Sequence, residues 1–124
     1  MEGQRVLAIA CDWRLRKLIR ANLEAVGLEV CEAVTGRQGI KMLDGCDADL
    51  VLLDLESPEV DAPHFLGAFD RRYPGCPVPV VGISTEPPDR QLMTSAVLVS
   101  HLKKPFAATL LLDRVQQALR SGIQ

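Results

Sequence analysis

Leu50-Val51-Leu52-Leu53-Asp54 is the stretch of sequence that decides the fold. Four consecutive apolar residues that end in a carboxylate are typical of a strand buried on both faces of a parallel sheet. A charged group at the end of so apolar a segment is costly to bury unless it has a partner or a task. The stretch therefore predicts an α/β fold and gives Asp54 a candidate chemical role.

On either side of this stretch, short apolar segments alternate with amphipathic ones. The predicted strands are residues 5–10, 28–33, 49–53, 80–83 and 97–102. Strands that alternate with helices predict a parallel sheet that is covered on both faces. Right-handed crossovers then favour a doubly wound, flavodoxin-like α/β fold with five strands in the order 2-1-3-4-5.

The predicted helices carry boundary signals of their own. Asp12 is a suitable N-cap for the first helix, and Gly27 is a suitable residue just past its end. The apolar face of this helix is predicted to comprise Leu15, Leu18, Ile19, Leu23 and Val26. The pair Thr35-Gly36 opens a second helix. We expect a short or displaced fourth helix from Pro87-Pro88 to about residue 95 and a last helix over residues 107–120.

Length and composition narrow the classes of protein. The chain has 124 residues, 48% of them hydrophobic and 4% aromatic, which suits one domain over residues 1–124 with an aliphatic core. A net charge of −2 and the lack of a basic run disfavour direct binding to nucleic acid. The apolar stretches are shorter than the ~18 residues that span a bilayer. Without a signal-peptide pattern, a cytoplasmic protein that does not bind membranes is expected.

An acid, a hydroxyl and an amine follow three of the predicted strands. Asp54 ends the third strand, Ser84 follows the fourth, and Lys104 follows the fifth. Doubly wound folds place function at this edge of the sheet. The trio suits a carboxylate that accepts a phosphoryl group, a hydroxyl that donates to a phosphoryl oxygen and an amine that neutralises charge. Each residue alone also has a purely structural explanation, as a cap, a local hydrogen bond or a surface lysine.

Over essentially its whole length the chain resembles the receiver domain of bacterial response regulators. Residues 49–61 resemble the phosphoacceptor segment of that family, and residues 79–85 resemble its fourth strand with the switch hydroxyl. Residues 102–106 resemble its lysine-proline-phenylalanine signature, and residues 33–36 match the start of its second helix.

The resemblance implies a function in two-component phosphorelay signalling. It implies that Asp54 is the phosphoacceptor, that Ser84 and Lys104 assist it, and that the bond before Pro105 is cis. A histidine kinase or phosphotransfer protein would supply the phosphoryl group, and a downstream protein partner would bind the face formed by residues 86–120. Such a protein is a signalling module and not an enzyme.

The metal site departs from the family pattern. Receiver domains usually carry two acidic residues after the first strand, and the resemblance places Ala10 and Cys11 there, with Asp12 one residue later. Mg²⁺ prefers oxygen ligands, and cysteine is a poor substitute. The remaining candidate ligands are Asp54, Glu56 and Asp12. We therefore expect Mg²⁺ binding to be weak or absent and phosphorylation by small donors to be slow.

Two further residues have both an ordinary and a functional interpretation. His101 stands where the family usually has an aromatic residue, and it is either a partly exposed strand histidine or a pH-sensitive or rewired switch residue. Cys11 is either a small neutral replacement for an acid or a redox-sensitive thiol beside Lys104. The four cysteines form no Cys-x-x-Cys pair, which disfavours a zinc site.

Other functions stay open on the sequence alone. A phosphorylation-independent interaction module would have the same fold, and Mg²⁺ binding and Asp54 labelling would distinguish it. Residues 54–57 loosely resemble the nucleophile motif of haloacid-dehalogenase-type phosphatases, but those enzymes carry that motif after their first strand. A flavodoxin is possible on the predicted fold alone, but no phosphate-binding loop rich in Ser, Thr or Gly follows the first strand. The chain is either a stand-alone module or a piece of a longer regulator.

Overall fold

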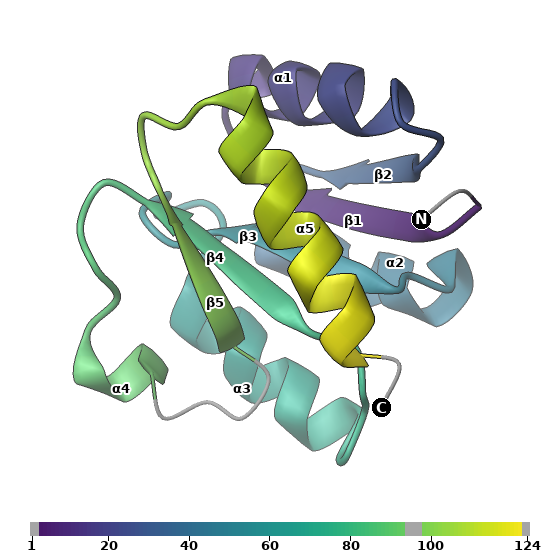
Figure 1. Ribbon diagram of the computed structural model, residues 1–124. Helices are drawn as coiled ribbons and strands as arrows, with labels where there is room; N and C mark the ends of the chain where they lie inside the picture. Colours follow the sequence, from purple (N-terminus) through teal and green to yellow (C-terminus); the bar gives the residue numbers. More distant parts are fainter. Residues whose placement is uncertain (1–2, 94–97, 123–124) are drawn as a thin grey trace.

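The computed structural model describes residues 3–93 and 98–122, which form one parallel sheet and the helices that cover it (Figure 1). The strands are β1 (Arg5–Ile9), β2 (Glu29–Ala33), β3 (Leu50–Asp54), β4 (Val80–Ser84) and β5 (Leu98–Lys103). The helices are α1 (Trp13–Glu24), α2 (Gly36–Cys46), α3 (Ala62–Arg72), α4 (Arg90–Met93) and α5 (Ala108–Gly122). The strand order is β2-β1-β3-β4-β5 with every pairing parallel, so the predicted fold class and topology are confirmed.

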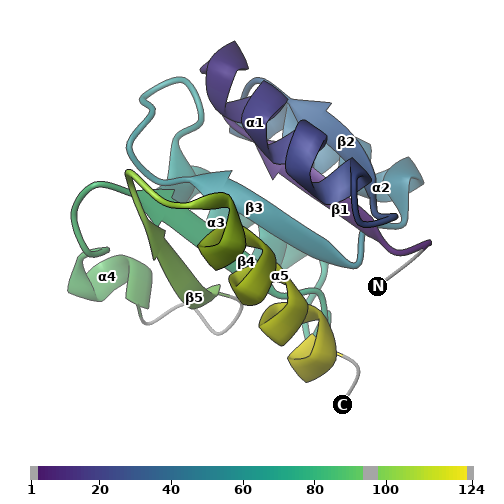
Figure 2. The ribbon, with the colours of Figure 1, turned by 45° about the horizontal axis from the view of Figure 1, so that its top comes forward.

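The helices form a layer on each face of the sheet. Helices α1 and α5 lie on one face, and α2 and α3 lie on the other (Figures 1 and 2). Alternate strand residues serve the two layers, since Val6 and Ala8 pack with α1 and α5 while Leu7 and Ile9 pack with α2 and α3. The central strands β1, β3 and β4 are thus buried on both sides, as their apolar residues require, whereas the edge strand β5 is largely half-buried or exposed.

The ends of α1 follow the sequence signals. Asp12 is the N-cap, and its carboxylate accepts a hydrogen bond of 2.9 Å from the backbone N–H of Arg14. At the other end Gly27 has a φ of 90°, and the N–H of Leu28 donates to the carbonyl of Leu23 at 3.1 Å. This is a Schellman motif, in which the glycine adopts a left-handed conformation without strain from a Cβ atom. Both predicted boundary residues are confirmed.

The apolar face predicted for α1 includes two residues that the structure leaves exposed. Ile19 and Leu23 are buried, but Leu18 is 43% exposed and Val26 is 37% exposed. Leu18 is turned by about 100° from Ile19 around the helix axis, which carries it away from the sheet. Val26 lies in the turn that follows the helix, where it does not meet the core.

Helix α4 begins later than predicted. It starts at Arg90 and not at Pro87-Pro88, because Asp89 accepts a hydrogen bond of 2.9 Å from the N–H of Leu92 and so acts as the cap. A residue that precedes a proline also disfavours helical backbone, which moves the start past the proline pair. The predicted end of this helix and the first residue of the fifth predicted strand, Val97, lie outside the described residues.

The last helix agrees with its prediction within the usual uncertainty of helix ends. Leu111, Val115 and Leu119 are buried against the sheet. The bond between Lys104 and Pro105 is cis, as the sequence resemblance implied. In the described ranges no helix has both the length and the apolar character that crossing a membrane requires.

Candidate functional site

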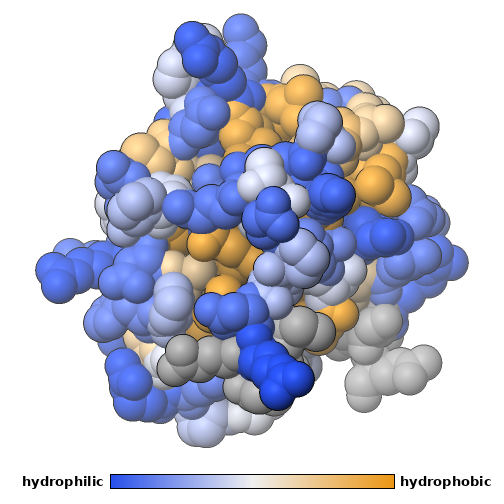
Figure 3. Space-filling model, turned by 90° about the vertical axis from the view of Figure 1, so that its left-hand side faces the viewer, coloured by the Kyte–Doolittle hydropathy of each residue, from blue (hydrophilic) through white to orange (hydrophobic). Residues whose placement is uncertain are grey.

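The predicted trio is brought to one edge of the sheet by the strand register. Asp54 in β3 is paired with Ile83 in β4, so Ser84 follows one position further along. The N–H of Lys104 donates to the carbonyl of Ser84 at 2.9 Å, which fixes the lysine next to the end of β4. Figure 3 views the molecule from the side where these strands end, and hydrophilic side chains there surround patches of apolar surface.

Asp54 is a buried carboxylate with a cation close to it. The residue is only 4% exposed, and its Oδ1 atom accepts a hydrogen bond of 3.0 Å from the N–H of Glu56. The Nζ atom of Lys104 lies 3.4 Å from the same oxygen. A buried carboxylate is costly without such a partner, and a carboxylate oxygen is an atom that can act as a nucleophile.

Glu56 is the second carboxylate beside Lys104. Its Oε1 atom lies 3.6 Å from Nζ of Lys104 and accepts a hydrogen bond of 2.8 Å from the N–H of Thr85, whose hydroxyl donates to the other oxygen. The hydrogen bonds from the side chain and the backbone of Thr85 lower the pKa of Glu56. Lys104 therefore lies between two negative charges, and Glu56 ties the end of β3 to the loop after β4.

Ser84 is engaged with His101. Its Oγ atom lies 2.6 Å from Nε2 of His101, and its hydroxyl also donates to the backbone carbonyl of Glu86. Because a hydroxyl has one hydrogen, this geometry suits an Nε2–H that donates to Ser84. Burial lowers the pKa of His101, an effect that Glu56 opposes and Lys103 reinforces.

The end of β1 carries no acidic pair. Ile9, the last residue of β1, is paired with Leu53, so Ala10 directly after β1 lies at the level of Asp54 in β3. Ala10 is buried and Cys11 is half-buried. The carboxylate of Asp12 caps α1.

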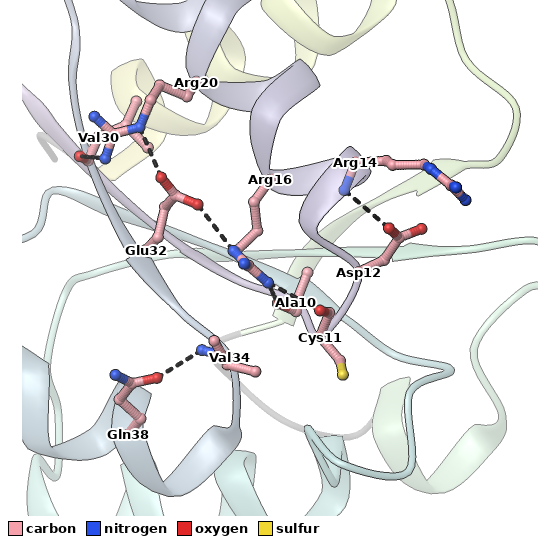
Figure 4. Close-up of polar contacts among 10 residues, drawn as sticks. All are labelled: Ala10, Cys11, Asp12, Arg14, Arg16, Arg20, Val30, Glu32, Val34 and Gln38. Atoms are coloured by element: carbon pink, nitrogen blue, oxygen red, sulfur yellow. Dashed lines mark hydrogen bonds and ion pairs between the residues drawn. The ribbon is translucent and has the colours of Figure 1, made fainter.

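Arg16 binds the backbone of this segment. Its Nη1 atom donates to the carbonyl of Ala10 at 2.7 Å and to the carbonyl of Cys11 at 2.9 Å (Figure 4). Its Nε atom donates to Glu32 at 2.8 Å, and Arg20 donates to the other Glu32 oxygen at 2.7 Å. Burial raises the pKa of Glu32, but the hydrogen bonds from Arg20 and Arg16 outweigh it and lower that pKa.

Sequence reasoning missed two of these contacts. The first is the contact of Thr85 with Glu56. Thr85 comes directly after Ser84, at the strand end, and this position in the sequence was a usable signal. The cluster of Arg16, Arg20 and Glu32 joins residues of α1 to β2, and no pattern in the sequence indicated it.

The three candidate metal ligands do not form one cluster. Across the part of the chain that the structure describes, no three His, Cys, Asp or Glu side chains form a group able to hold a metal ion. Asp54 and Glu56 both lie beside Lys104, while Asp12 caps α1. Among the described residues, the carboxylates in contact with Lys104 are therefore those of Asp54 and Glu56, and Asp12 lines a groove next to them.

Comparisons with known proteins agree on one family. The family model for the response regulator receiver domain matches residues 6–116. The KDP operon transcriptional regulatory protein KdpE of Escherichia coli is 31% identical over 115 residues, which cover 93% of this chain and 51% of KdpE. The transcriptional regulatory protein GlrR of the same organism is 29% identical over 117 residues, which cover 94% of this chain and 26% of GlrR.

A solved structure shares the fold. The crystal structure of a CheY-like response regulator receiver domain protein from Methanospirillum hungatei matches with a TM-score of 0.85 at 19% identity. The match covers 96% of this chain and 95% of that one. The chain spans about half the length of KdpE and about a quarter of the length of GlrR.

Proposed function

The chain belongs to the family of response regulator receiver domains of two-component systems, and we propose that Asp54 is the residue through which it accepts a phosphoryl group. Phosphorylation on an aspartate is typical of this family. The observation that supports Asp54 is its place at the end of β3, buried and 3.4 Å from the amine of Lys104. The protein then acts as a signalling module whose only chemistry is its own phosphorylation and dephosphorylation.

The proposed step is an in-line transfer to an Asp54 oxygen. A carboxylate oxygen of Asp54 forms a bond to phosphorus while the bond from phosphorus to the nitrogen or oxygen of the donor breaks. The leaving group carries away that electron pair: a nitrogen leaving group takes up a proton, whereas the acetate of acetyl phosphate leaves as the anion. Lys104 neutralises charge on the transferred group, which is the main way proteins accelerate this transfer.

Receiver domains normally use Mg²⁺ for this reaction. Here the residues do not fit a carboxylate-rich metal site, because Ala10 offers no side-chain ligand, Cys11 offers a soft one and Asp12 caps a helix. Both oxygens of Glu56 already accept hydrogen bonds from Thr85. We therefore propose that Mg²⁺, if held by Asp54, Glu56 and water, binds weakly and that small donors phosphorylate Asp54 slowly.

We propose two surfaces for protein partners. An open groove beside the site is lined on one side by Asp12, Arg14, Leu15 and Leu18 and on the other by Lys104, Pro105 and Phe106. This groove, next to the candidate phosphoacceptor, suits a histidine kinase or a phosphotransfer protein as donor. The 86–120 face, which includes β5 and α5, is the proposed surface for a downstream partner.

Phosphoryl labelling tests the proposal. We expect wild-type protein incubated with radiolabelled acetyl phosphate and Mg²⁺ to form an acid-stable, base-labile adduct slowly, with saturation only at metal concentrations of tens of millimolar. Asp54→Asn should remove the label completely. Lys104→Met should reduce its rate by roughly 10-fold or more, because one charge-neutralising group is lost.

A metal titration provides the second readout. Trp13 opens α1, two residues after Cys11 in the segment that follows β1. Its fluorescence can be followed with Mg²⁺ and with beryllium fluoride as a phosphoryl mimic. Label that persists in Asp54→Asn would overturn the assignment of the phosphoacceptor. An absence of both label and fluorescence response in folded protein would instead favour a module that signals by protein contact alone.

A further inference from the structure

Two cysteines that the phosphoryl site does not use lie in contact. Cys31 is the middle residue of β2, where it is paired in register with Leu7 of β1. Cys46 is the last residue of α2. Their sulfur atoms are 2.8 Å apart, although 15 positions separate them in the sequence.

The course of α2 and hydrogen bonds from Arg5 position the two cysteines against each other. Helix α2 follows β2 and runs back along the sheet, so that its last turn returns to the edge strand. Asp47 ends the helix in a left-handed conformation with a φ of 52°. The guanidinium of Arg5 in β1 donates to the carbonyl of Cys46, and the Arg5 N–H donates to Asp49 at 2.8 Å. The end of α2 is therefore anchored to β1, beside Cys31.

We propose that Cys31 and Cys46 are a redox site that closes to an intramolecular disulfide on exposure to a peroxide and reopens with a thiol reductant. A disulfide has a sulfur–sulfur bond of about 2.05 Å, so the two atoms need to approach by less than one ångström. In the described residues Cys11 and Cys76 have no such thiol neighbour.

The two thiols have different surroundings, which sets the order of events. Cys46 is buried, and burial together with its hydrogen bond to Cys31 raises the pKa of its thiol to about 12. Cys31 is only half-buried, so it is the sulfur that an oxidant in solution reaches first. Reactivity of a thiol toward oxidants depends on such access and on thiolate character.

The chemistry balances with a peroxide as the oxidant. The Cys31 sulfur takes an oxygen atom from the peroxide and becomes a sulfenic acid, while the peroxide leaves as an alcohol or water. The Cys46 sulfur then attacks the Cys31 sulfur, and water leaves. In sum, the two thiols lose two electrons and two protons, and the peroxide takes them up.

The pair is remote from the phosphoryl site. Helix α2 runs opposite to the strands, so Cys46 lies toward the edge where the strands begin, whereas Asp54 lies where β3 ends. The disulfide would join edge strand β2 to the end of α2 and restrict the unfolded chain, so its main effect is on stability.

Mass spectrometry of the full chain tests the proposal directly. After treatment with a small excess of hydrogen peroxide, the monomer should lose the mass of two hydrogen atoms, and peptide mapping should find Cys31 joined to Cys46. Alkylation should then modify only Cys11 and Cys76 of the four cysteines. The Tm should rise by roughly 5–10 °C and return to its initial value after dithiothreitol.

Variants provide the matched comparison. Cys11→Ala/Cys76→Ala keeps the pair and should give the same mass loss and the same Tm shift. Cys31→Ser removes only the more exposed sulfur and should lose both, and Cys46→Ala is a second variant with the same expectation. A map that joins either cysteine to Cys11 or Cys76, covalent dimers, or sulfinic acid on Cys31 without a cross-link would overturn the proposal.

Discussion

The contact between His101 and Ser84 places a titratable ring against the hydroxyl at the end of β4. Burial lowers the pKa of His101 below its ordinary value of 6.5. The nearby charges have opposite effects, since Glu56 favours the protonated ring and Lys103 disfavours it. In the folded state the ring therefore stays neutral at pH values where the unfolded chain already protonates it.

This difference predicts a pH dependence of stability. Below pH 6.5 the unfolded state binds more protons than the folded state, so the free energy of unfolding falls as the pH decreases. The loss continues until the pH reaches the lowered pKa of folded His101 and then stops. Urea denaturation between pH 5 and pH 7.5 measures the slope, and in His101→Phe its His101-dependent part should disappear.

The other histidine provides the control. His64 is exposed on α3, so His64→Gln should leave the slope in place. Equal slopes in the wild type and in His101→Phe would show that this ring titrates alike in the folded and unfolded states.

At the scale of elements, the start of α2 depends on close backbone contact. Thr35 is the N-cap, and its hydroxyl accepts a hydrogen bond of 3.1 Å from the N–H of Gln38. The N–H of Gly36 donates to the carbonyl of Val60 at 3.1 Å. A Cβ atom on Gly36 would collide with that carbonyl oxygen and would lie 3.3 Å from Cβ of Phe65. The segment before α3 can approach α2 only because residue 36 is a glycine.

Two glycines of the same helix should therefore respond in opposite ways to alanine. Gly36→Ala should lower the free energy of unfolding by about 1–3 kcal/mol, because a backbone carbonyl cannot move aside without loss of its hydrogen bond. Gly45 has open space around its Cα atom. Gly45→Ala should raise that free energy by up to about 1 kcal/mol, because alanine is the better helix former.

Chemical denaturation at pH 7 measures the free energy of unfolding of the two variants and of the wild type. Their equal m-values would show that the same surface is exposed on unfolding. If both alanines stabilised the protein, the contact between Gly36 and Val60 would not limit packing.

At the scale of the molecule, most of the fold could be predicted because it rests on local patterns. The apolar strands, the capping residue Asp12 and the terminal Gly27 each act within a few residues of their own positions. Strand order then followed from general rules of chain crossover. The start of α4 could not be placed because two prolines and a competing cap at Asp89 lie within a few positions.

The candidate site could also be predicted in part, from the positions of the strand ends. Asp54, Ser84 and Lys104 could be placed at one edge because the ends of the strands in a parallel sheet converge there. The contacts that join distant parts of the chain, Thr85 with Glu56 and Arg16 with Glu32, were not found. The position of Thr85 at a strand end was a usable signal for the first contact, whereas the second depends on side-chain directions between α1 and β2 that no sequence spacing encodes.

The two layers of the molecule share one sheet, which predicts that they unfold together. Neighbouring residues of β1 pack into opposite layers, so one layer cannot lose its packing without freeing the strand that supports the other. Leu111 of α5 and Leu66 of α3 are buried leucines on opposite faces. Leu111→Ala and Leu66→Ala should each lower the free energy of unfolding by about 2–5 kcal/mol in a single transition.

Hydrogen exchange distinguishes this from separate unfolding of the layers. Each variant should lose protection in β1 and β3 and in the helices of both faces, to the extent that global stability falls. Leu18→Ala, on the exposed side of α1, should change stability by less than about 1 kcal/mol. If Leu66→Ala instead reduced protection only in α2 and α3, the layers would be independent, and the shared strands would not transmit the loss of packing between them.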